Sequence, residues 1–369
     1  MLMIRDRAMK RHSIMNFGSH HTSRSSLFHL DIYFVILLMV MQLPMTFAST
    51  ENDTQIEIVF KRIPLMGTFV DFNVVTPKDR IKEAEKAIER ATAAMQDFVD
   101  VVSSWDPQSD TSKINANAGK QPVKINERLM RVLLRAREIS KLSGGALDVT
   151  VSPVGKLWSL KKDNPLIPDN KQIQKTLKLV KYKDLILDPE KGTAFLRRKG
   201  MRIDLGAIAK GAAVDVGIAS LRKSGFEHAL INAGGDLYAM GSKPDGPWKV
   251  GIQTPREEHG NVMMKFEVED RAVATSGDYE KMVVINGKRY HHILDPKTGR
   301  PADKCISVTV IAENAETADA LATAFFVLGP DRGMYLSERL PEVEVLFVDS
   351  AFKISRSSSF PHTEQNGIY

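Results

Sequence analysis

The chain has 369 residues, of which 43% are hydrophobic and 26% are charged, as expected of a soluble globular protein with one large domain or two ordinary ones. The formal net charge is +6, and residues 1–48 carry about half of it. The rest is too weakly basic, and too poor in basic runs interleaved with aromatic residues, to predict a nucleic-acid partner. The single cysteine, Cys305, excludes an intrachain disulfide and a thiolate metal cluster.

The N-terminal segment is organised like a secretory signal. A basic, polar stretch precedes the apolar run Ile32–Met41, and small residues follow up to Ala48. The run is shorter than the about 20 apolar residues of a membrane-spanning helix, and an uncleaved anchor is the alternative. No cysteine follows the run that could carry a lipid. We therefore predict an export segment over 1–48, a single domain over 49–369, and a periplasmic protein that is soluble or held at the inner membrane by its signal.

The first half of this domain is predicted to open with strands and to continue with two helices. Apolar residues recur on one face of 78–101, which predicts an amphipathic helix. A second helix over Asn126–Leu142 ends at Gly144-Gly145. Between them Ser103–Gly119 is polar and is predicted to be a loop, and Asn164–Lys183 is predicted to be a loop with a short surface helix. The expected strands are Gln55–Lys61 and Thr68–Val75.

In the second half, short strands dominate. A strand over Arg202–Leu205 is predicted to run into a helix over 207–224, and the last helix, Ala315–Leu328, is closed by Gly329-Pro330. Asn286-Gly287 between two strands is a hairpin signal. Antiparallel runs of strands with helices between them predict an α+β fold, with mixed, mainly antiparallel sheets and packed helices in one compact domain. The remaining expected strands are His228–Ala233, Leu237–Met240, Trp248–Gln253, Met263–Val268, Arg271–Ala274, Met282–Ile285, Arg289–Leu294, Ser307–Ile311, Glu344–Val348 and Phe352–Ser355.

The junction between the strand that ends at Asp204 and the following helix is the first candidate site. A glycine, Gly206, turns the chain into the helix, and Lys210 lies one turn in. Free N–H groups and a partial positive charge at a helix start suit a phosphate, to which Lys210 would add a point charge. The sequence is not a Walker A loop, and no Rossmann fingerprint is present. On its own, such a junction serves packing more often than ligand binding.

The second candidate is a pair of oxygen-bearing side chains in the last helix. Asp319 and Thr323 are four residues apart, so they share a helix face, and they are surrounded by alanines that allow another segment to come close. A carboxylate and a hydroxyl suit Mg²⁺, which takes few protein ligands and completes its shell with phosphate oxygens and water. The alternative is a first-turn aspartate favoured by the helix dipole, beside a threonine bonded to its own helix.

Two further positions carry side chains suited to a ligand site. His291 and His292 follow each other on a strand, so they point to opposite faces and at most one faces a given site. A lone strand histidine is more often packed or on the surface than catalytic, and no second pair supports zinc. Trp105 lies in a polar loop, where its ring could stack on a flat ligand or anchor the loop in the core.

Taken in chain order, these motifs resemble the ApbE family of FAD:protein FMN transferases, formerly described as thiamine-biosynthesis lipoproteins, over about residues 58 to 350. The blocks around Asp204, His292 and Asp319 are specific in combination. The motifs are Met66-Gly67-Thr68, Ser104-Trp105-Asp106-Pro107, Gly145-Ala146-Leu147-Asp148, Asp204-Leu205-Gly206-Ala207, Asn232-Ala233-Gly234-Gly235-Asp236, His292-Ile293-Leu294-Asp295-Pro296 and Thr317-Ala318-Asp319-Ala320-Leu321-Ala322-Thr323.

The resemblance implies a function and a set of site residues. It implies transfer of the FMN half of FAD to a Thr or Ser hydroxyl of an exported target protein, with release of AMP. Mg²⁺ would be held by the backbone carbonyl of Ala207 and by the side chains of Asp319 and Thr323, and His292 would assist proton transfer, so that His292 and Asp319 are the expected catalytic residues. The FAD site would be lined by Met66, Trp105, Ala146, Leu147, Asp148, Asp204, Lys210 and Ile293.

The resemblance also indicates partners and leaves alternatives open. Typical acceptors in the family are subunits of sodium-pumping NADH:quinone reductase and of RNF-type electron-transport complexes. Trp105 stands where the relatives usually have tyrosine, which preserves stacking but removes any phenol hydrogen bond. The lipoprotein cysteine is absent, which indicates a soluble exported enzyme. The alternative functions are hydrolysis of FAD to FMN and AMP, and carriage of FAD without catalysis.

Overall fold

The structure is a computed structural model that describes residues 55–257 and 260–365. The predicted export segment lies outside the described residues. Among the residues that are described, no helix combines the length and the apolar character needed to span a bilayer. The residues from Thr54 onward form one compact unit of helices and antiparallel strands, which confirms the predicted single domain of α+β class.

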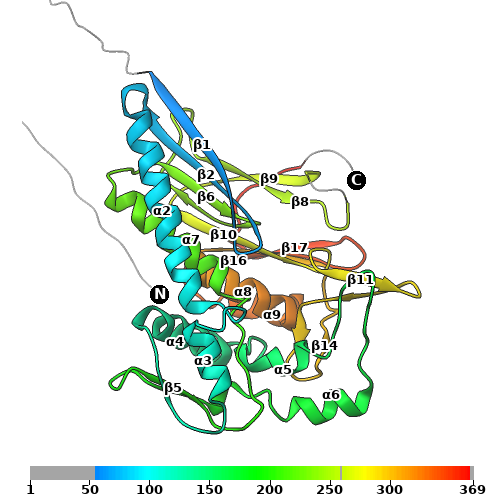
Figure 1. Cartoon of the computed structure of the whole chain (residues 1–369). Coiled ribbons are helices and arrows are strands. Elements are labelled where there is room, and N and C mark those ends of the chain that lie inside the picture. The colour runs from blue at the N-terminus through cyan, green and yellow to red at the C-terminus, as the bar shows by residue number, and fades with distance from the viewer. Residues whose placement is uncertain (1–54, 258–259, 366–369) are drawn as a thin grey trace, which may run out of the picture. The chain divides into compact units, whose positions relative to one another are not determined.

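An eight-stranded sheet with antiparallel pairing throughout is the centre of the fold (Figure 1). Its strand order is β1-β2-β6-β7-β10-β15-β16-β17. Side chains alternate between its two faces, as in β2, where Val70, Phe72 and Val74 are buried on one face. The strands are β1 (Ile56–Leu65), β2 (Thr68–Pro77), β6 (Ala229–Ala233), β7 (Asp236–Met240), β10 (Arg271–Gly277), β15 (Ser307–Ala312), β16 (Glu344–Val348) and β17 (Ile354–Arg356).

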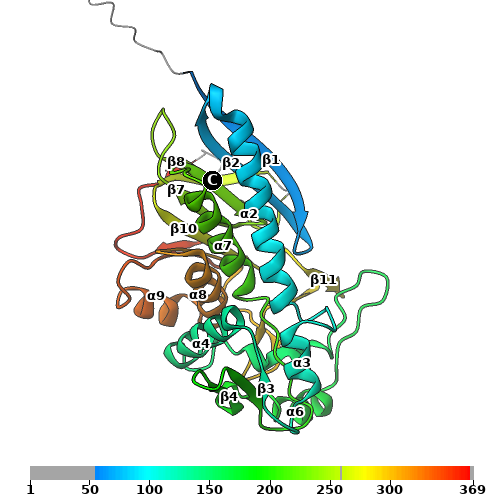
Figure 2. The same cartoon turned by 60° about the vertical axis from the view of Figure 1, so that its left-hand side comes forward.

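Each face of the sheet has a different cover. Helices α2 (Ile81–Val102), α7 (Ala209–Lys223) and α8 (Ala315–Leu328) lie on one face (Figures 1 and 2). The small sheet of β8 (Trp248–Gln253), β9 (Val262–Val268) and β18 (Glu364–Gln365) packs through its own apolar cluster against the other face. The main core therefore lies between the sheet and the three helices, where α2 contributes Ala84, Ile88, Ala91, Met95 and Phe98.

A smaller group of elements lies beyond the ends of these helices (Figure 1). It contains a three-stranded sheet in the order β3-β5-β4 and the helices α3 to α6, while the hairpin β11–β12 and the short α9 complete the fold. The bounds are α3 (Asp110–Ala116), β3 (Val123–Lys124), α4 (Glu127–Leu142), α5 (Ser152–Gly155), α6 (Asn170–Leu177), β4 (Leu185–Asp188), β5 (Thr193–Leu196), β11 (Met282–Ile285), β12 (Lys288–His291), β13 (Leu294–Asp295), β14 (Arg300–Pro301) and α9 (Pro330–Ser337), with 3₁₀ turns at Lys78–Arg80, Val149–Val151 and Tyr182–Asp184.

Several of the sequence predictions for segments near the candidate site are wrong. The strand expected over Arg289–Leu294 ends at His291 in β12, and Leu294 begins the separate strand β13. The expected loop Ser103–Gly119 contains helix α3, which Ser109 caps by accepting a hydrogen bond from the N–H of Ser112. The expected strand Arg202–Leu205 pairs with no strand among the described residues, because its N–H groups bond instead to the side chain of Asn115 and to the carbonyl of Val149. The strand expected to end at Ala274 continues to Gly277, paired with β15.

The hairpin prediction is confirmed. Val283 to Ile285 pair with Tyr290 to Lys288, and Asn286 and Gly287 form the turn with φ angles of 50° and 75°. Both central residues are thus in the left-handed region, which Asn-Gly tolerates best. This hairpin leads directly into the segment that carries the two histidines.

Candidate active site

Helices α7 and α8 cross near their N-terminal ends, and Gly211 makes the crossing possible. A Cβ atom on Gly211 would lie 2.0 Å from the carbonyl oxygen of Ala315, so only glycine fits. One turn further along α7, the carboxylate of Asp215 accepts hydrogen bonds from the N–H groups of Ala315 (2.8 Å) and Glu316 (2.9 Å). A side chain of one helix thus caps the first turn of the other. We call this crossing, with Gly211, Asp215, Ala315, Glu316 and Asp319, the α7–α8 junction.

Asp319 lies on the face of α8 that meets α7. Its side chain is buried, and its Oδ2 accepts a 3.0 Å hydrogen bond from the N–H of Gly211. Gly211 is the third residue of α7, so its N–H is one of the donors that a helix start leaves without an intrahelical partner. Ala207 precedes the N-cap residue Ile208, so its carbonyl lies outside the hydrogen-bond ladder of the helix. Burial, and then the charge of Asp236, raise the pKa of Asp319 to about 8. The site thus favours a positive charge next to this carboxylate.

Thr323 follows one turn after Asp319, and its Oγ1 lies 3.5 Å from Oγ of Ser276 on β10. Carboxylate, hydroxyl and carbonyl oxygens are the ligands that suit Mg²⁺, so the side chains of Asp319 and Thr323 with the carbonyl of Ala207 fit this ion. Over residues 55–257 and 260–365, no three His, Cys, Asp or Glu side chains come together as a metal-binding group. A metal at this place would therefore depend on hydroxyl, carbonyl and substrate oxygens beside the one carboxylate.

Lys210, predicted to meet a phosphate, forms an ion pair in the structure. Its Nζ lies 2.5 Å from Oδ2 of the buried Asp236, which follows the turn Gly234-Gly235. Burial opposes the charged form of Lys210, but the charges of Asp236 and Asp319 outweigh it and raise its pKa. Lys210 therefore stays charged, and because an ammonium has three donors, it can donate to Asp236 and to a ligand at the same time.

Asp204 connects the start of α7 to the loop that carries Trp105. Its Oδ1 accepts a hydrogen bond from the N–H of Gly206 (2.9 Å), and its Oδ2 accepts one from Oγ of Ser104 (2.6 Å). The next residue, Trp105, is 89% exposed, which excludes the alternative of a core anchor. An exposed indole held beside the start of a helix is free to stack on a flat ring. We call residues 103–109 the Trp105 loop.

The predicted residues Ala146, Leu147 and Asp148 can meet a ligand mainly through their backbone. The side chains of Ala146 and Leu147 are buried in the main core. The carboxylate of Asp148 accepts hydrogen bonds from Thr150 and from the N–H of Tyr182 (2.9 Å), and burial raises its pKa despite these bonds. The segment reaches the site through the 2.8 Å bond between the N–H of Asp204 and the carbonyl of Val149.

Met66 and Ile293 are held by backbone geometry. Met66 has a φ of 55° in the tight turn between β1 and β2, and its side chain packs partly buried against the main core. The following strand begins with Thr68, whose Oγ1 would lie 2.6 Å from a Cβ on Gly234, so this turn lies close to the Gly234-Gly235 turn. Ile293 is buried, and its N–H lies 3.3 Å from Nδ1 of His291.

The two histidines differ, although they do not share a strand as predicted, because β12 ends at His291 and His292 follows it. His291 is buried, and its Nε2 lies 2.8 Å from the carbonyl oxygen of Ala302. The side chain of His292 is exposed. Desolvation by the protein atoms around its ring, and next the charge of Lys281, nevertheless lower its pKa to about 4. Lys210 contributes to the same shift, so His292 belongs to the surroundings of Lys210. At neutral pH His292 is uncharged and able to accept a proton.

The described contacts therefore join the predicted residues into two groups. Ala207, Lys210, Asp319 and Thr323 meet around the α7–α8 junction, and Asp204 ties the Trp105 loop and the segment before Val149 to the start of the same helix. Sequence reasoning missed Asp215, although it had a signal, because it is the only acidic residue of α7. The sequence predicts Ser276 in a polar turn that suits a ligand groove, and the structure places it within β10 instead.

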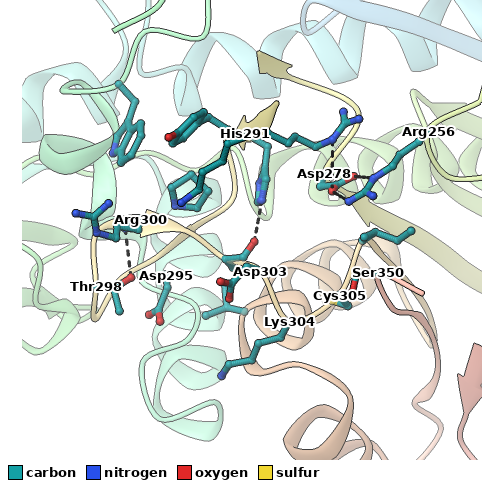
Figure 3. Close-up of a pocket in the computed structure, with 18 residues that line it drawn as sticks. Arg256, Asp278, His291, Asp295, Thr298, Arg300, Asp303, Lys304, Cys305 and Ser350 are labelled. Carbon is teal, nitrogen blue, oxygen red and sulfur yellow. Dashed lines mark hydrogen bonds and ion pairs between the residues drawn. The ribbon is translucent and has the colours of Figure 1, made fainter. Parts of the chain in front are cut away.

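A cavity of about 420 Å³ lies beside the end of β12 and the segment 295–306 (Figure 3). His291 lines it, whereas His292 and the other residues predicted for the site do not. The cavity is therefore distinct from the α7–α8 junction. The junction, with its buried carboxylates, paired lysine and neutral histidine, has the parts needed to bind and cleave a charged phosphate ester.

Comparison with known proteins gives consistent matches. The sequence profile of the ApbE family matches residues 66–347. The chain is 31% identical over 303 residues to an FAD:protein FMN transferase of Vibrio cholerae, covering 80% of this chain and 90% of the relative. It is 34% identical over 299 residues to an FAD:protein FMN transferase of Treponema pallidum, covering 77% and 82%.

Solved structures agree with the sequence matches. The ApbE protein of Thermotoga maritima superposes with a TM-score of 0.75 at 33% identity, covering 82% of this chain and 98% of the other. The flavin transferase ApbE of Vibrio cholerae gives a TM-score of 0.75 at 30% identity, covering 83% and 99%. At this identity and coverage, the resemblance extends to the arrangement of the whole domain.

Proposed function

Since the chain belongs to the ApbE family, it is an enzyme that transfers FMN from FAD to a target protein, and we propose that it does so with Mg²⁺ at the α7–α8 junction and His292 as the proton acceptor. The observation that carries the proposal is the hydrogen bond from the N–H of Gly211 to the buried carboxylate of Asp319, which fixes this carboxylate at the start of α7. Ala207 lies just before the N-cap of α7, so its carbonyl is outside the helix ladder and can face a cation.

The metal would be held by the Ala207 carbonyl and the side chains of Asp319 and Thr323. Bound there, Mg²⁺ would neutralise charge on the pyrophosphate of FAD as its P–O–P link breaks. The raised pKa of Asp319 supports this assignment, because a buried carboxylate near a second acid is stabilised by a nearby cation. Asp215 holds the two helices that carry the metal ligands together.

FAD would be bound by groups on both sides of the start of α7. The ring of Trp105 offers a stacking surface, and the helix start with Lys210 offers N–H groups and charge to the pyrophosphate. Asp204 keeps these two parts at a fixed separation, because it bonds to both Gly206 and Ser104. Fixed separation matters because positioning and electrostatics supply most of the catalysis in phosphoryl transfer.

The chemical step uses His292 as a base. The hydroxyl oxygen of the acceptor Thr or Ser attacks the phosphorus on the FMN side, its proton passes to the neutral imidazole, and AMP leaves with the electron pair of the broken P–O bond. The lowered pKa of His292 supports this role, since the ring is unprotonated at neutral pH. Lys210 can balance charge on the pyrophosphate oxygens throughout.

The acceptor is proposed to be an exported redox protein, such as a subunit of a sodium-pumping NADH:quinone reductase or of an RNF-type complex. The support is the basic stretch, apolar run Ile32–Met41 and small residues at the start of the sequence, which are typical of export. On this proposal the enzyme works in the periplasm, soluble or held at the inner membrane.

One experiment tests the proposal. The full chain is incubated with FAD, Mg²⁺ and the periplasmic domain of an RNF-type subunit, and flavin fluorescence on a denaturing gel is measured together with released AMP. Labelled acceptor with an equal amount of AMP is the expected result. AMP without label indicates an FAD hydrolase, and neither product indicates a carrier; a reaction that proceeds equally after chelation of all divalent metal contradicts the metal assignment.

A further inference from the structure

The cavity that His291 lines has no part in the chemistry proposed above. It lies among β12, the segment 295–306 and the turn that follows β8 (Figure 3). One wall is aromatic: the rings of Trp158 and Tyr290 are 5.8 Å apart, and Nε1 of Trp158 donates to the carbonyl of Gly299. A volume of about 420 Å³ exceeds that of several waters, each of which takes about 30 Å³, so the cavity can hold a side chain with part of its backbone.

The cavity is basic. Five Lys or Arg and three Asp side chains line it, which leaves two positive charges in excess. Asp278 is buried and faces two guanidinium groups: Nη2 of Arg256 lies 2.5 Å from its Oδ2, and Nε of Arg289 lies 3.8 Å from the same oxygen. One carboxylate is thus shared by two arginines, so the three groups together carry one positive charge that is available to a ligand.

Two local features indicate that these arginines are held for a purpose other than packing. Nη1 of Arg289 is buried and has no hydrogen-bond partner among the described residues, although buried donors are normally paired. Arg256 adopts a φ of 66°, a left-handed conformation that is unfavourable for a residue other than glycine and that is found more often at ligand-binding sites than elsewhere. In the bound state, an anion would supply the missing partner of Arg289.

The position of the cavity indicates that its ligand belongs to the acceptor protein. His291 lines the cavity and is adjacent in sequence to His292, so their Cα atoms are about 3.8 Å apart. A protein that brings a hydroxyl to His292 covers about 800 Å² of surface around it, and this neighbourhood includes the hairpin that walls the cavity. A bound acceptor therefore has a basic cavity within its reach.

We propose that this cavity receives an acidic side chain of the acceptor protein, so that the arginines beside Asp278 help to select and orient the segment that carries the reacting hydroxyl. The proposal rests on the proposed function, because it assumes that the acceptor hydroxyl is presented to His292. The aromatic wall would contact the apolar part of the same segment, and the shared carboxylate of Asp278 would keep the two guanidinium groups apart and directed at the ligand.

Peptide binding tests the proposal without depending on catalysis. Two fluorescein-labelled 15-residue peptides are compared, identical except that four Glu in one are Gln in the other, by fluorescence anisotropy at low salt with the full chain saturated with FAD. The variants are Arg289→Gln and Lys288→Gln in the cavity, with Arg128→Gln on the exposed start of α4 as a control of equal charge change. We expect the Glu peptide to bind at least fivefold more tightly than the Gln peptide, and this preference to vanish in the two cavity variants but not in Arg128→Gln.

Equal binding of the two peptides by the wild-type chain overturns the proposal, and so does a preference that Arg128→Gln reduces as much as Arg289→Gln does. If inorganic phosphate alone binds with the same dependence on Arg289 while the peptides do not differ, the cavity is a site for free anions and the proposal fails. Transfer of FMN from FAD to the periplasmic domain of an RNF-type subunit is measured in parallel for the wild-type chain and all variants. Absence of transfer by the wild-type chain would contradict the proposed function, whereas the peptide preference is measured independently of it.

Discussion

The α7–α8 junction and the Trp105 loop hold the two ends of the same proposed substrate in opposite ways. In the junction, Asp319 is buried and Asp215 accepts two backbone hydrogen bonds from the neighbouring helix. In the loop, Trp105 is 89% exposed, and Ser104 links its segment to the body through Asp204. The part proposed to position a cation is thus buried and cross-bonded, while the part proposed only to bind is left accessible.

The largest effect is expected when the carboxylate of the junction is removed. Asp319→Asn keeps the shape of the side chain but replaces the proposed anionic ligand, so FMN transfer should become undetectable with the fold intact. The measurements are acceptor labelling, thermal unfolding, and binding of Mn²⁺ by electron paramagnetic resonance in the absence of FAD. Metal-dependent labelling at the wild-type rate would remove Asp319 from the metal site.

In the metal-free protein, Asp319→Asn should change how the free energy of unfolding depends on pH. The pKa of Asp319 is about 8 in the folded state against a reference of 3.8, so the folded state binds the proton more tightly than the unfolded state. The stability from this group is present below about pH 4 and is lost as the pH rises towards 8. Asp319→Asn should flatten this decline in urea unfolding at pH 5 and pH 8, and addition of Mg²⁺ should stabilise only the wild-type protein at pH 8.

The second-largest effect on catalysis is expected when the proposed base, His292, is removed. His292→Ala should lower kcat by roughly 10²–10⁴-fold, the range for a lost general base, with a much smaller change in the affinity for FAD. Desolvation lowers the pKa of His292 to about 4. With Mg²⁺ saturating at each pH, so that Asp319 stays ionised, kcat/KM of the wild-type enzyme should therefore stay high down to about pH 5 and fall below it. Equal losses in turnover and FAD affinity would show that the ring only positions the ligand.

The close helix crossing gives a smaller, structural effect that can be matched with a control. A Cβ on Gly211 would lie 2.0 Å from the Ala315 carbonyl, whereas a Cβ on Gly155 would meet nothing within 4 Å. Gly211→Ala should therefore cost about 1–3 kcal/mol of stability through overpacking and weaken metal binding by displacing Asp319. Gly155→Ala should be close to neutral. Equal unfolding midpoints in urea for Gly211→Ala and Gly155→Ala would mean that the helices can move apart at the junction without a measurable loss of stability.

The two regions also differ in how far the sequence could predict them. The helix Ala315–Leu328 was predicted with its bounds, because its apolar period and Gly329-Pro330 stop are local signals. The hydrogen bond from the Gly211 N–H to Asp319 was not predictable, since it depends on the crossing of two helices about a hundred residues apart. Helix α3 was predicted as loop because its seven residues are too few for an apolar period to be visible. Arg202–Leu205 has the composition of a strand, although a side chain and a loop carbonyl take its hydrogen bonds.

The smallest effect is expected in the Trp105 loop, where it should be confined to binding. Trp105→Ala removes a ring that is 89% exposed, so unfolding should change by less than about 0.5 kcal/mol. Stacking of an aromatic side chain on a flat base is worth about 1–3 kcal/mol, so the affinity for FAD should fall roughly tenfold, as measured by quenching of flavin fluorescence. Trp105→Tyr should restore most of this affinity and Ser104→Ala should lose part of it, because the bond to Asp204 holds the loop in place. A fall in kcat with unchanged FAD affinity would give the loop a part in the chemical step and would remove the distinction between the two regions.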